Sequence, residues 1–220
     1  LAETEDENAF CIDRLGERPL DYIARLGWLD APGWLAHGIH FSLNEIKRLG
    51  EANVGVSHCP SSNMILGSGI CPVIDLETAR VPVGLGVDGS ASADSSNLMQ
   101  EVRQALLIQR LTSPPETVTP ERALTWGTVG GAKLIQRDDI GQIAPGYEAD
   151  LAFFSLEELR FSGAEDPLSA LVLSGAHRAK HVMVGGNWVV SDYHLNTIDI
   201  DRLAFDHSSA ASALLERSQV

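Results

Sequence analysis

The sequence predicts an α/β protein, the second half of a (β/α)8 TIM-type barrel. Short apolar runs alternate with segments of helical periodicity, and turn residues lie between them, which is typical of parallel strands joined by helices. The apolar run 83–86 ends in Val87-Asp88-Gly89-Ser90, a carboxylate followed by a loop rich in Gly and Ser. An α/β barrel carries its chemistry at such strand ends. After Asp139 the pattern changes to turn residues and short β-type runs.

Four strand–helix units are expected before that change, which is half of an eight-stranded barrel. Strands are predicted near residues 34–37, 54–58 and 82–87, and a fourth is cut short at residue 1. Helices are predicted over 18–29, from the cap Ser42 to a stop at Gly50, over 74–79, from the cap Ser96 or Asn97 to Leu111, and from Thr119-Pro120 to Ala132 or Leu134. The segment Cys59-Pro60-Ser61-Ser62-Asn63 is predicted to be a loop.

Two domains are expected, residues 1–138 and residues 139–220. In the second, residues 149–154 form a β-type run, and 181–190 read as a hairpin over Gly185-Gly186. The tail from Ile200 to Leu215 has the periodicity of a closing amphipathic helix.

Composition restricts the class of protein. The chain has 220 residues, 44% of them hydrophobic, and a net charge of −14, which argues against a protein that binds nucleic acid through its phosphates. No run approaches the roughly 18 apolar residues of a membrane span, and no signal peptide is visible. The three cysteines form no CxxC pair, so we expect reduced thiols and a cytoplasmic protein.

Three side chains that can transfer protons end successive apolar stretches. They are Glu3, His37 and Asp88, and each stretch precedes an amphipathic helical pattern. Because parallel strands end at the same edge of a sheet, we expect these side chains to form one catalytic site. Taken singly, each has a simpler explanation: Asp88 before Gly is ordinary turn chemistry, and Glu3 is a solvated charge.

Other polar residues are weaker candidates. His40 lies three residues after His37, but we expect it in the loop that follows the strand. His58, Ser61 and Asn63 are candidate substrate-binding residues, although hydrogen bonds within their own loop would explain them equally well. The segment Gly67-Ser68-Gly69 lacks the Lys of a phosphate-binding loop.

Five motifs in this order resemble the second half of a metal-dependent aminohydrolase of the amidohydrolase superfamily. The branch is the one that holds guanine, cytosine and S-adenosylhomocysteine deaminases and the triazine hydrolases. The motifs are Leu1-Ala2-Glu3-Thr4, Ala36-His37-Gly38-Ile39-His40, His58-Cys59-Pro60-Ser61-Ser62-Asn63, Leu66-Gly67-Ser68-Gly69-Ile70 and Leu85-Gly86-Val87-Asp88-Gly89-Ser90-Ala91-Ser92. The segment Pro145-Gly146-Tyr147-Glu148-Ala149-Asp150-Leu151 resembles the return of that branch into a small β-sandwich domain.

The resemblance implies a role for each catalytic candidate. Asp88 would be a ligand of one divalent metal ion, zinc or alternatively iron, and the base that takes a proton from the attacking water. Glu3 would shuttle protons to the substrate ring and to the leaving amine, and His37 would polarise the substrate or steady the hydroxide. The family's other metal ligands are histidines, one directly before the residue matching Leu1 and a His-x-His pair on the first strand.

Neither of those histidine motifs is present in this chain. One carboxylate cannot hold a hydrolytic metal ion, which needs about three or four protein ligands. A four-stranded half-barrel would also have two open edges. We therefore expect a C-terminal fragment, inactive alone, of a protein about twice as long that forms a homo-oligomer.

The resemblance also suggests a substrate. Residues 161–163, 166–173 and 184–190 are most similar to those of the 8-oxoguanine deaminases, which implies release of ammonia from 8-oxoguanine to give urate. A hydroxytriazine, or another purine or pyrimidine, is the alternative small heterocyclic substrate. From a different class, the chain could be a metal-free homologue without catalytic activity.

Overall fold

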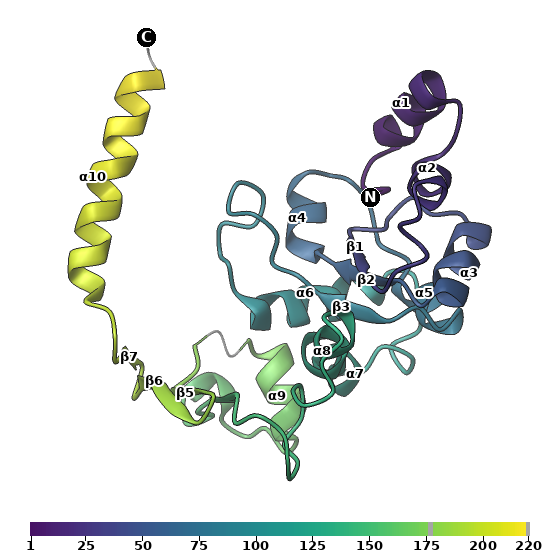
Figure 1. Cartoon of the computed structure of the whole chain (residues 1–220). Helices are drawn as coiled ribbons and strands as arrows, with labels where there is room; N and C mark the ends of the chain where they lie inside the picture. Colours follow the sequence, from purple (N-terminus) through teal and green to yellow (C-terminus); the bar gives the residue numbers. More distant parts are fainter. Residues whose placement is uncertain (176–177, 219–220) are drawn as a thin grey trace. The chain divides into compact units, whose positions relative to one another are not determined.

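The computed structural model describes residues 1–175 and 178–218. Within them the chain divides into two compact units (Figure 1). The first comprises residues 1–147 and 156–175, and the second comprises residues 148–155 and 178–218. Each unit is described by itself.

The division differs from the expected domain boundary at residue 139. Residues 156–175 return to the first unit because helix α9 (Pro167–Leu173) packs against helices α6 (Leu98–Gln109) and α7 (Pro120–Thr125). Val172 of α9 is fully buried in the core of this unit. Asp166 caps α9 by accepting hydrogen bonds from the N–H groups of Leu168 and Ser169.

The first unit contains a parallel sheet of three strands in the order β1–β2–β3, which confirms the three complete strands predicted from the sequence. The strands are β1 (Trp34–Ala36), β2 (Gly55–His58) and β3 (Val83–Leu85). All residues of β2 and β3 are buried, as expected for a parallel sheet covered by helices. No strand is assigned at residue 1. Leu1 nevertheless flanks His37 with two backbone hydrogen bonds, from its nitrogen to the Ala36 carbonyl (3.0 Å) and from the Gly38 N–H to its own carbonyl (3.2 Å).

The sequence predicts helices near 18–29, 42–50, 74–79, 96–111 and 119–134, but not those at Glu5–Leu15, Pro60–Ile65 and Pro167–Leu173. Helices surround this sheet (Figure 1). They are α1 (Glu5–Leu15), α2 (Pro19–Arg25), α3 (Leu43–Ala52), α4 (Pro60–Ile65), α5 (Val73–Thr78), α6 (Leu98–Gln109), α7 (Pro120–Thr125), the π-helical turn η1 (Trp126–Gly130) and α8 (Gly131–Leu134), with the 3-10 turn η2 (Leu159–Phe161) before α9. The expected caps Ser42, Asn97 and Thr119 are confirmed, since each side chain accepts a backbone N–H of the first turn.

Two details of the helix prediction are wrong. Helix α3 continues past Gly50 to Ala52 and ends at Asn53, which adopts the left-handed conformation (φ 53°) that asparagine tolerates. Gly50 is instead a packing position, because a Cβ there would lie 2.0 Å from the Ala79 carbonyl oxygen. Residues 60–63, predicted as loop, form α4, where Pro60 fits the first helical position.

The second unit is an antiparallel sheet in the order β4–β5–β6–β7, followed by helix α10 (Ile200–Ser218). Its strands are β4 (Leu151–Phe153), β5 (His181–Val184), β6 (Asn187–Ser191) and β7 (His194–Leu195). The predicted hairpin is confirmed, with Gly185 (φ 53°) and Gly186 (φ 78°) supplying the positive φ angles of a tight turn. In the described part of this unit there is one sheet, not the two of a sandwich.

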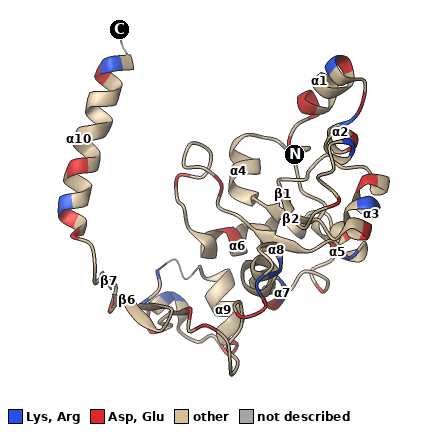
Figure 2. Cartoon of the chain, viewed as in Figure 1, with Lys and Arg blue, Asp and Glu red and all other residues tan. Residues whose placement is uncertain are grey.

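Charged residues lie on the helices and loops rather than on the parallel strands. Figure 2 shows β1 and β2 without acidic or basic residues, while red acidic positions mark α1, α3 and α10. Among the described residues, no helix combines the length and the apolar character needed to cross a membrane.

Candidate active site

The carboxyl edge of the parallel sheet brings together the three side chains predicted from the sequence. Nε2 of His37 lies 3.5 Å from Oε2 of Glu3 and 3.6 Å from Oδ2 of Asp88. His37 follows β1 directly, and Asp88 lies three residues beyond β3. The residues come from distant parts of the chain and meet because parallel strands end at a common edge.

Glu3 is positioned by the backbone around it. The Ala2 carbonyl accepts hydrogen bonds from the N–H groups of Ile39 and His40, both at 2.9 Å, which ties this segment to the loop after β1. Thr4 then caps α1 by accepting the Glu7 N–H. Glu7 in turn accepts the Glu3 N–H at 2.8 Å, so the backbone on both sides of the Glu3 side chain is held.

Strained backbone conformations coincide with these positions. Ala2 (φ 53°), His37 (φ 69°) and Asp88 (φ 62°) all adopt the left-handed region, which residues other than glycine rarely occupy. Each such residue costs on the order of 1–3 kcal/mol, and clusters of them are typical of functional sites. The strain therefore supports one site built from these three segments.

Hydrogen bonds hold the Asp88 carboxylate in its ionised form. Ser62 Oγ donates to Oδ2 at 2.7 Å, and the Gly89 N–H donates to Oδ1 at 2.8 Å. Ser92 Oγ, which also contacts Ser62 Oγ at 2.8 Å, lies 3.5 Å from Oδ2. These bonds, that of Ser62 foremost, lower the pKa of Asp88 below its ordinary value. Asp88 is therefore an anion at neutral pH.

The three weaker candidates are buried, and one of them contacts a catalytic candidate. Asn63 is fully buried, and its Oδ1 lies 2.9 Å from Nδ1 of His37. Ser61 is buried, and its N–H donates to Oε2 of Glu101 at 2.9 Å. His58 is fully buried, and burial lowers its pKa to about 3, so its ring is neutral.

His40 lies in the loop after β1, as expected, rather than beside His37. Its Nε2 lies 2.9 Å from the Ser68 carbonyl oxygen, and its Nδ1 lies 3.0 Å from Oε1 of Glu5. These contacts connect the loop to α1 and to the segment after α4, so His40 has a structural explanation.

Three residues at the site were missed by the sequence reasoning. Ser62 and Ser92 both contact Asp88, and Glu101 of α6 holds the start of α4. A signal for Glu101 exists in the sequence, since it lies among the apolar residues of its helix and is fully buried. A buried carboxylate without function or partner is rare. The two serines carry no such signal, because serine is common in loops.

The described residues do not by themselves make a metal site. They contain no group of three or more His, Cys, Asp or Glu side chains placed to hold an ion. Asp88 fits as one ligand, because it is ionised and lies at the carboxyl edge of the sheet.

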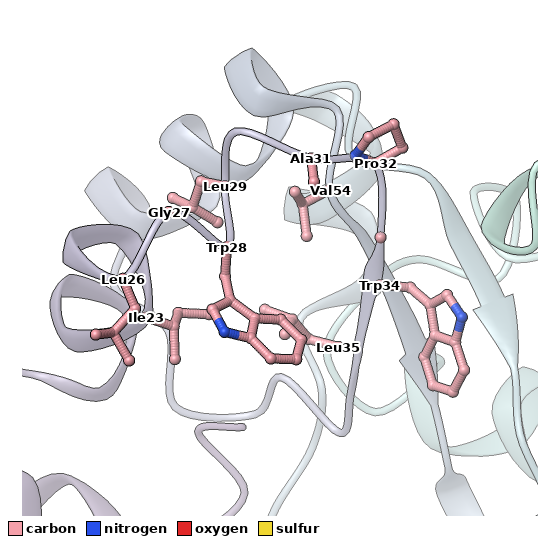
Figure 3. Close-up of a pocket in the computed structure, with 11 residues that line it drawn as sticks. Ile23, Leu26, Gly27, Trp28, Leu29, Ala31, Pro32, Trp34, Leu35 and Val54 are labelled. Atoms are coloured by element: carbon pink, nitrogen blue, oxygen red, sulfur yellow. The ribbon is translucent and has the colours of Figure 1, made fainter.

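An apolar pocket lies at the other end of the sheet and is separate from this site (Figure 3). Its volume is about 480 Å³, and Trp28, Trp34, Leu35 and Val54 are among its lining residues. Trp34 begins β1 and Val54 directly precedes β2, so the pocket is at the amino ends of the strands. Among the described residues, no acidic, basic or histidine side chain lines it, so these residues give the pocket no means of acid–base chemistry.

A parallel sheet with two carboxylates and a histidine at its carboxyl edge is how α/β-barrel proteins present acid–base chemistry. Comparison with known proteins makes this class specific. A sequence model described as the Amidohydrolase family matches residues 1–189. The chain therefore belongs to the amidohydrolase family.

The chain is similar to about half of the sequence of several curated relatives. It is 58% identical over 215 residues to the 8-oxoguanine deaminase of Pseudomonas aeruginosa, covering 98% of the chain and 48% of that protein. It is 35% identical over 219 residues to a 5-methylthioadenosine/S-adenosylhomocysteine deaminase of Natronomonas pharaonis, covering 99% of the chain and 51% of that protein. The chain thus spans about half the length of these relatives.

Solved structures agree with the fold. A zinc-bound adenosine deaminase from Xanthomonas campestris superposes with a TM-score of 0.91 at 29% identity, covering 98% of the chain and 50% of that structure. An atrazine chlorohydrolase from Arthrobacter aurescens, complexed with zinc, superposes with a TM-score of 0.86 at 28% identity, covering 92% and 46%.

Proposed function

We propose that this chain is the C-terminal half of a metal-dependent hydrolase that releases ammonia from an amino-substituted N-heterocycle. The observation that carries the proposal is the meeting of Glu3, His37 and Asp88 within 3.6 Å at one sheet edge. Family membership and the deaminases among the relatives support it. In this proposal the first unit supplies strands five to eight of the barrel, and residues 148–155 and 178–218 supply part of the small β-domain.

The proposal includes one divalent metal ion, zinc or alternatively iron. Three of the similar structures hold zinc. Asp88 would be one ligand, and histidines outside this chain would complete the set of three or four that such an ion needs. When bound, the ion supplies a water of low pKa to the site.

The residues of this chain would manage the protons of the reaction. Asp88 accepts a proton from the attacking water while the water oxygen bonds to the ring carbon that bears the amine. Glu3 donates a proton to a ring nitrogen. The proton that Asp88 took from the water then passes to the amine, the hydroxyl of the adduct returns a proton to Glu3 as it becomes the carbonyl, and the carbon–nitrogen bond breaks with loss of ammonia. His37, with Nε2 facing both carboxylates, would polarise the substrate or steady the attacking hydroxide.

We propose 8-oxoguanine as the substrate and urate as the product. The 58% identity to an 8-oxoguanine deaminase supports this choice. Other small heterocycles are alternative substrates. An isoxanthopterin deaminase is 33% identical to the chain, and triazine hydrolases are among the similar structures. His58, Ser61 and Asn63 stay candidates for the substrate side of the site.

The test is ammonia release by the complete zinc-loaded protein from a panel of purines, pterins, pyrimidines and triazines. We expect 8-oxoguanine to give the highest kcat/KM. Glu3→Gln and Asp88→Asn should each lower kcat by about 10²–10⁴-fold, because each removes one acid–base group. Glu51→Gln is the matched control, since Glu51 lies on the exposed face of α3 and pairs there with Lys47. Activity on another heterocycle would change the substrate, and no activity on any would favour the metal-free, non-catalytic homologue.

We further propose that the complete protein is a cytoplasmic homo-oligomer with no nucleic-acid or membrane partner. The three cysteines of the chain are free thiols in the structure, which supports a reducing compartment. The net charge of −14 supports a surface that does not attract phosphates. Cell fractionation tests the cytoplasmic location, and light scattering of the purified protein tests the oligomeric state.

A further inference from the structure

We propose that Asn63 is a positioning residue that orients His37 through its Nδ1 atom. The inference deepens the proposed function and rests on it, because His37 is taken as part of the catalytic site. It assigns Asn63 a task different from contact with the substrate.

The contact joins two buried side chains. Oδ1 of Asn63 lies 2.9 Å from Nδ1 of His37, and Asn63 is fully buried while His37 is 9% exposed. With the amide oxygen as acceptor, Nδ1 carries the hydrogen. The ring is then fixed so that Nε2, and not Nδ1, faces Glu3 and Asp88.

The rest of the Asn63 amide argues for orientation rather than stability. Its Nδ2 is buried and hydrogen-bonds to no other described residue. Burying an unsatisfied amide N–H costs on the order of 1–3 kcal/mol, which is at least as much as the roughly 0.5–1.5 kcal/mol that the single bond to His37 contributes. An apolar side chain of similar size would pack there at least as well, so the amide serves the histidine.

Helix α4 gives this contact a rigid base. Ser62, the residue before Asn63, donates its hydroxyl to Asp88 at 2.7 Å. Ser61, one residue earlier, donates its N–H to the buried carboxylate of Glu101. Three successive residues thus connect α6, Asp88 and His37, and the position of Asn63 is set from both sides.

The kinetic test compares two variants of the complete zinc-loaded protein. Asn63→Leu keeps the size of the side chain and removes the acceptor, so we expect kcat to fall by about 10–100-fold, as for partners that orient a functional histidine, with little change in KM. Asn63→Asp keeps an oxygen that can only accept, so it should retain most of kcat. Equal kcat for Asn63→Leu and the wild type, or equal losses in both variants, would overturn the inference.

Gln109→Leu is the matched control for a buried amide in the same unit. Gln109 is 1% exposed and donates to the Cys71 carbonyl at 2.9 Å, away from the site. Its replacement should lower the melting temperature and leave kcat unchanged. A loss of kcat comparable to that of Asn63→Leu would show that any buried amide matters, and the inference would fail.

A spectroscopic readout separates this inference from the proposed function. In the zinc-loaded protein without substrate, the imidazole Nδ1–H of His37 should give a proton resonance, assigned by its loss in His37→Asn. The resonance should persist in Asn63→Asp and shift or exchange away in Asn63→Leu. An unchanged resonance in Asn63→Leu would refute the role of Asn63 even if the deaminase is active. If the wild type releases no ammonia from any substrate, the proposed function fails and this spectrum still decides the contact.

Discussion

His58 is an unusual residue for the interior of a protein. It ends strand β2, is fully buried, and neither ring nitrogen hydrogen-bonds to another described residue. Burial, together with the nearby charge of His37, lowers its pKa from 6.5 to about 3. Protonating it in the folded state therefore costs free energy, whereas the unfolded chain takes up the proton freely.

This difference predicts a loss of stability in acid. As the pH falls from about 6.5 toward 3, the unfolded state binds a proton that the folded state does not, so the free energy of unfolding decreases by up to about 1.4 kcal/mol per pH unit. His58→Gln removes this contribution. Denaturant unfolding of the complete protein should show a stability loss between pH 7.5 and 4.5 that is smaller in the variant by about 2–3 kcal/mol.

His207→Gln is the control for that measurement, because it makes the same replacement at an exposed position of α10. In His207→Gln the free energy of unfolding should fall with pH as steeply as in the wild type. Parallel pH profiles for His58→Gln and the wild type would mean that His58 is protonated in the folded state, contrary to its burial.

The catalytic candidates were predictable at the scale of residues because local sequence marks them. Asp88 before Gly89 and His37 before Gly38 follow apolar runs, and the structure places both at strand ends. The environment of each was not predictable, since it depends on distant partners. Asn63 lies 26 positions from His37, and Ser62 lies 26 positions from Asp88.

Helix α4 shows the same limit at the scale of elements. Its six residues are too few to show helical periodicity, and Cys59 before it makes no capping hydrogen bond with its side chain. The carboxylate that accepts the Ser61 N–H comes from Glu101, 40 positions later. Strands and long helices were predictable because their own residues define them, whereas a short helix capped from another element was not.

The π-helical turn η1 packs closely against strand β3. A Cβ on Gly130 would lie 2.2 Å from the carbonyl oxygen of Val83 in β3, and this is backbone that cannot turn aside. Gly131 is the next residue and opens α8, yet a Cβ there would meet no atom within 4 Å. Packing against β3 thus explains the glycine at 130, whereas the space around residue 131 does not require one.

Alanine at each position tests this packing. Gly130→Ala should destabilise the complete protein by roughly 1–3 kcal/mol or more, because β3 or the turn must shift. Gly131→Ala should be neutral or stabilise by about 0.5–1 kcal/mol, since alanine favours helix and has space there. Thermal unfolding of both variants gives the comparison. Equal stabilities would show that η1 does not press against β3.

At the scale of the whole molecule, the sequence predicted two regions but not their exact membership. The antiparallel strands after residue 148 read clearly from their β-type runs and the Gly185-Gly186 turn. The return of α9 to the first unit could not be predicted. The apolar residues of α9 are visible in the sequence, but the surface that they cover is not. Val172 packs in a core formed by residues far earlier in the chain.

The last prediction concerns the metal ion and follows from the ligands that the chain can offer. Asp88 is one carboxylate, and the described residues hold no group of three metal-binding side chains. The isolated 220-residue chain should therefore bind far less than one zinc ion per molecule, while the complete protein should bind one. Metal analysis after dialysis measures both, and chelation should abolish ammonia release by the complete protein until zinc returns. One tightly held zinc ion in the isolated chain would require a ligand set that Asp88 and its neighbours do not present, and would contradict the division of the site between two halves of a longer protein.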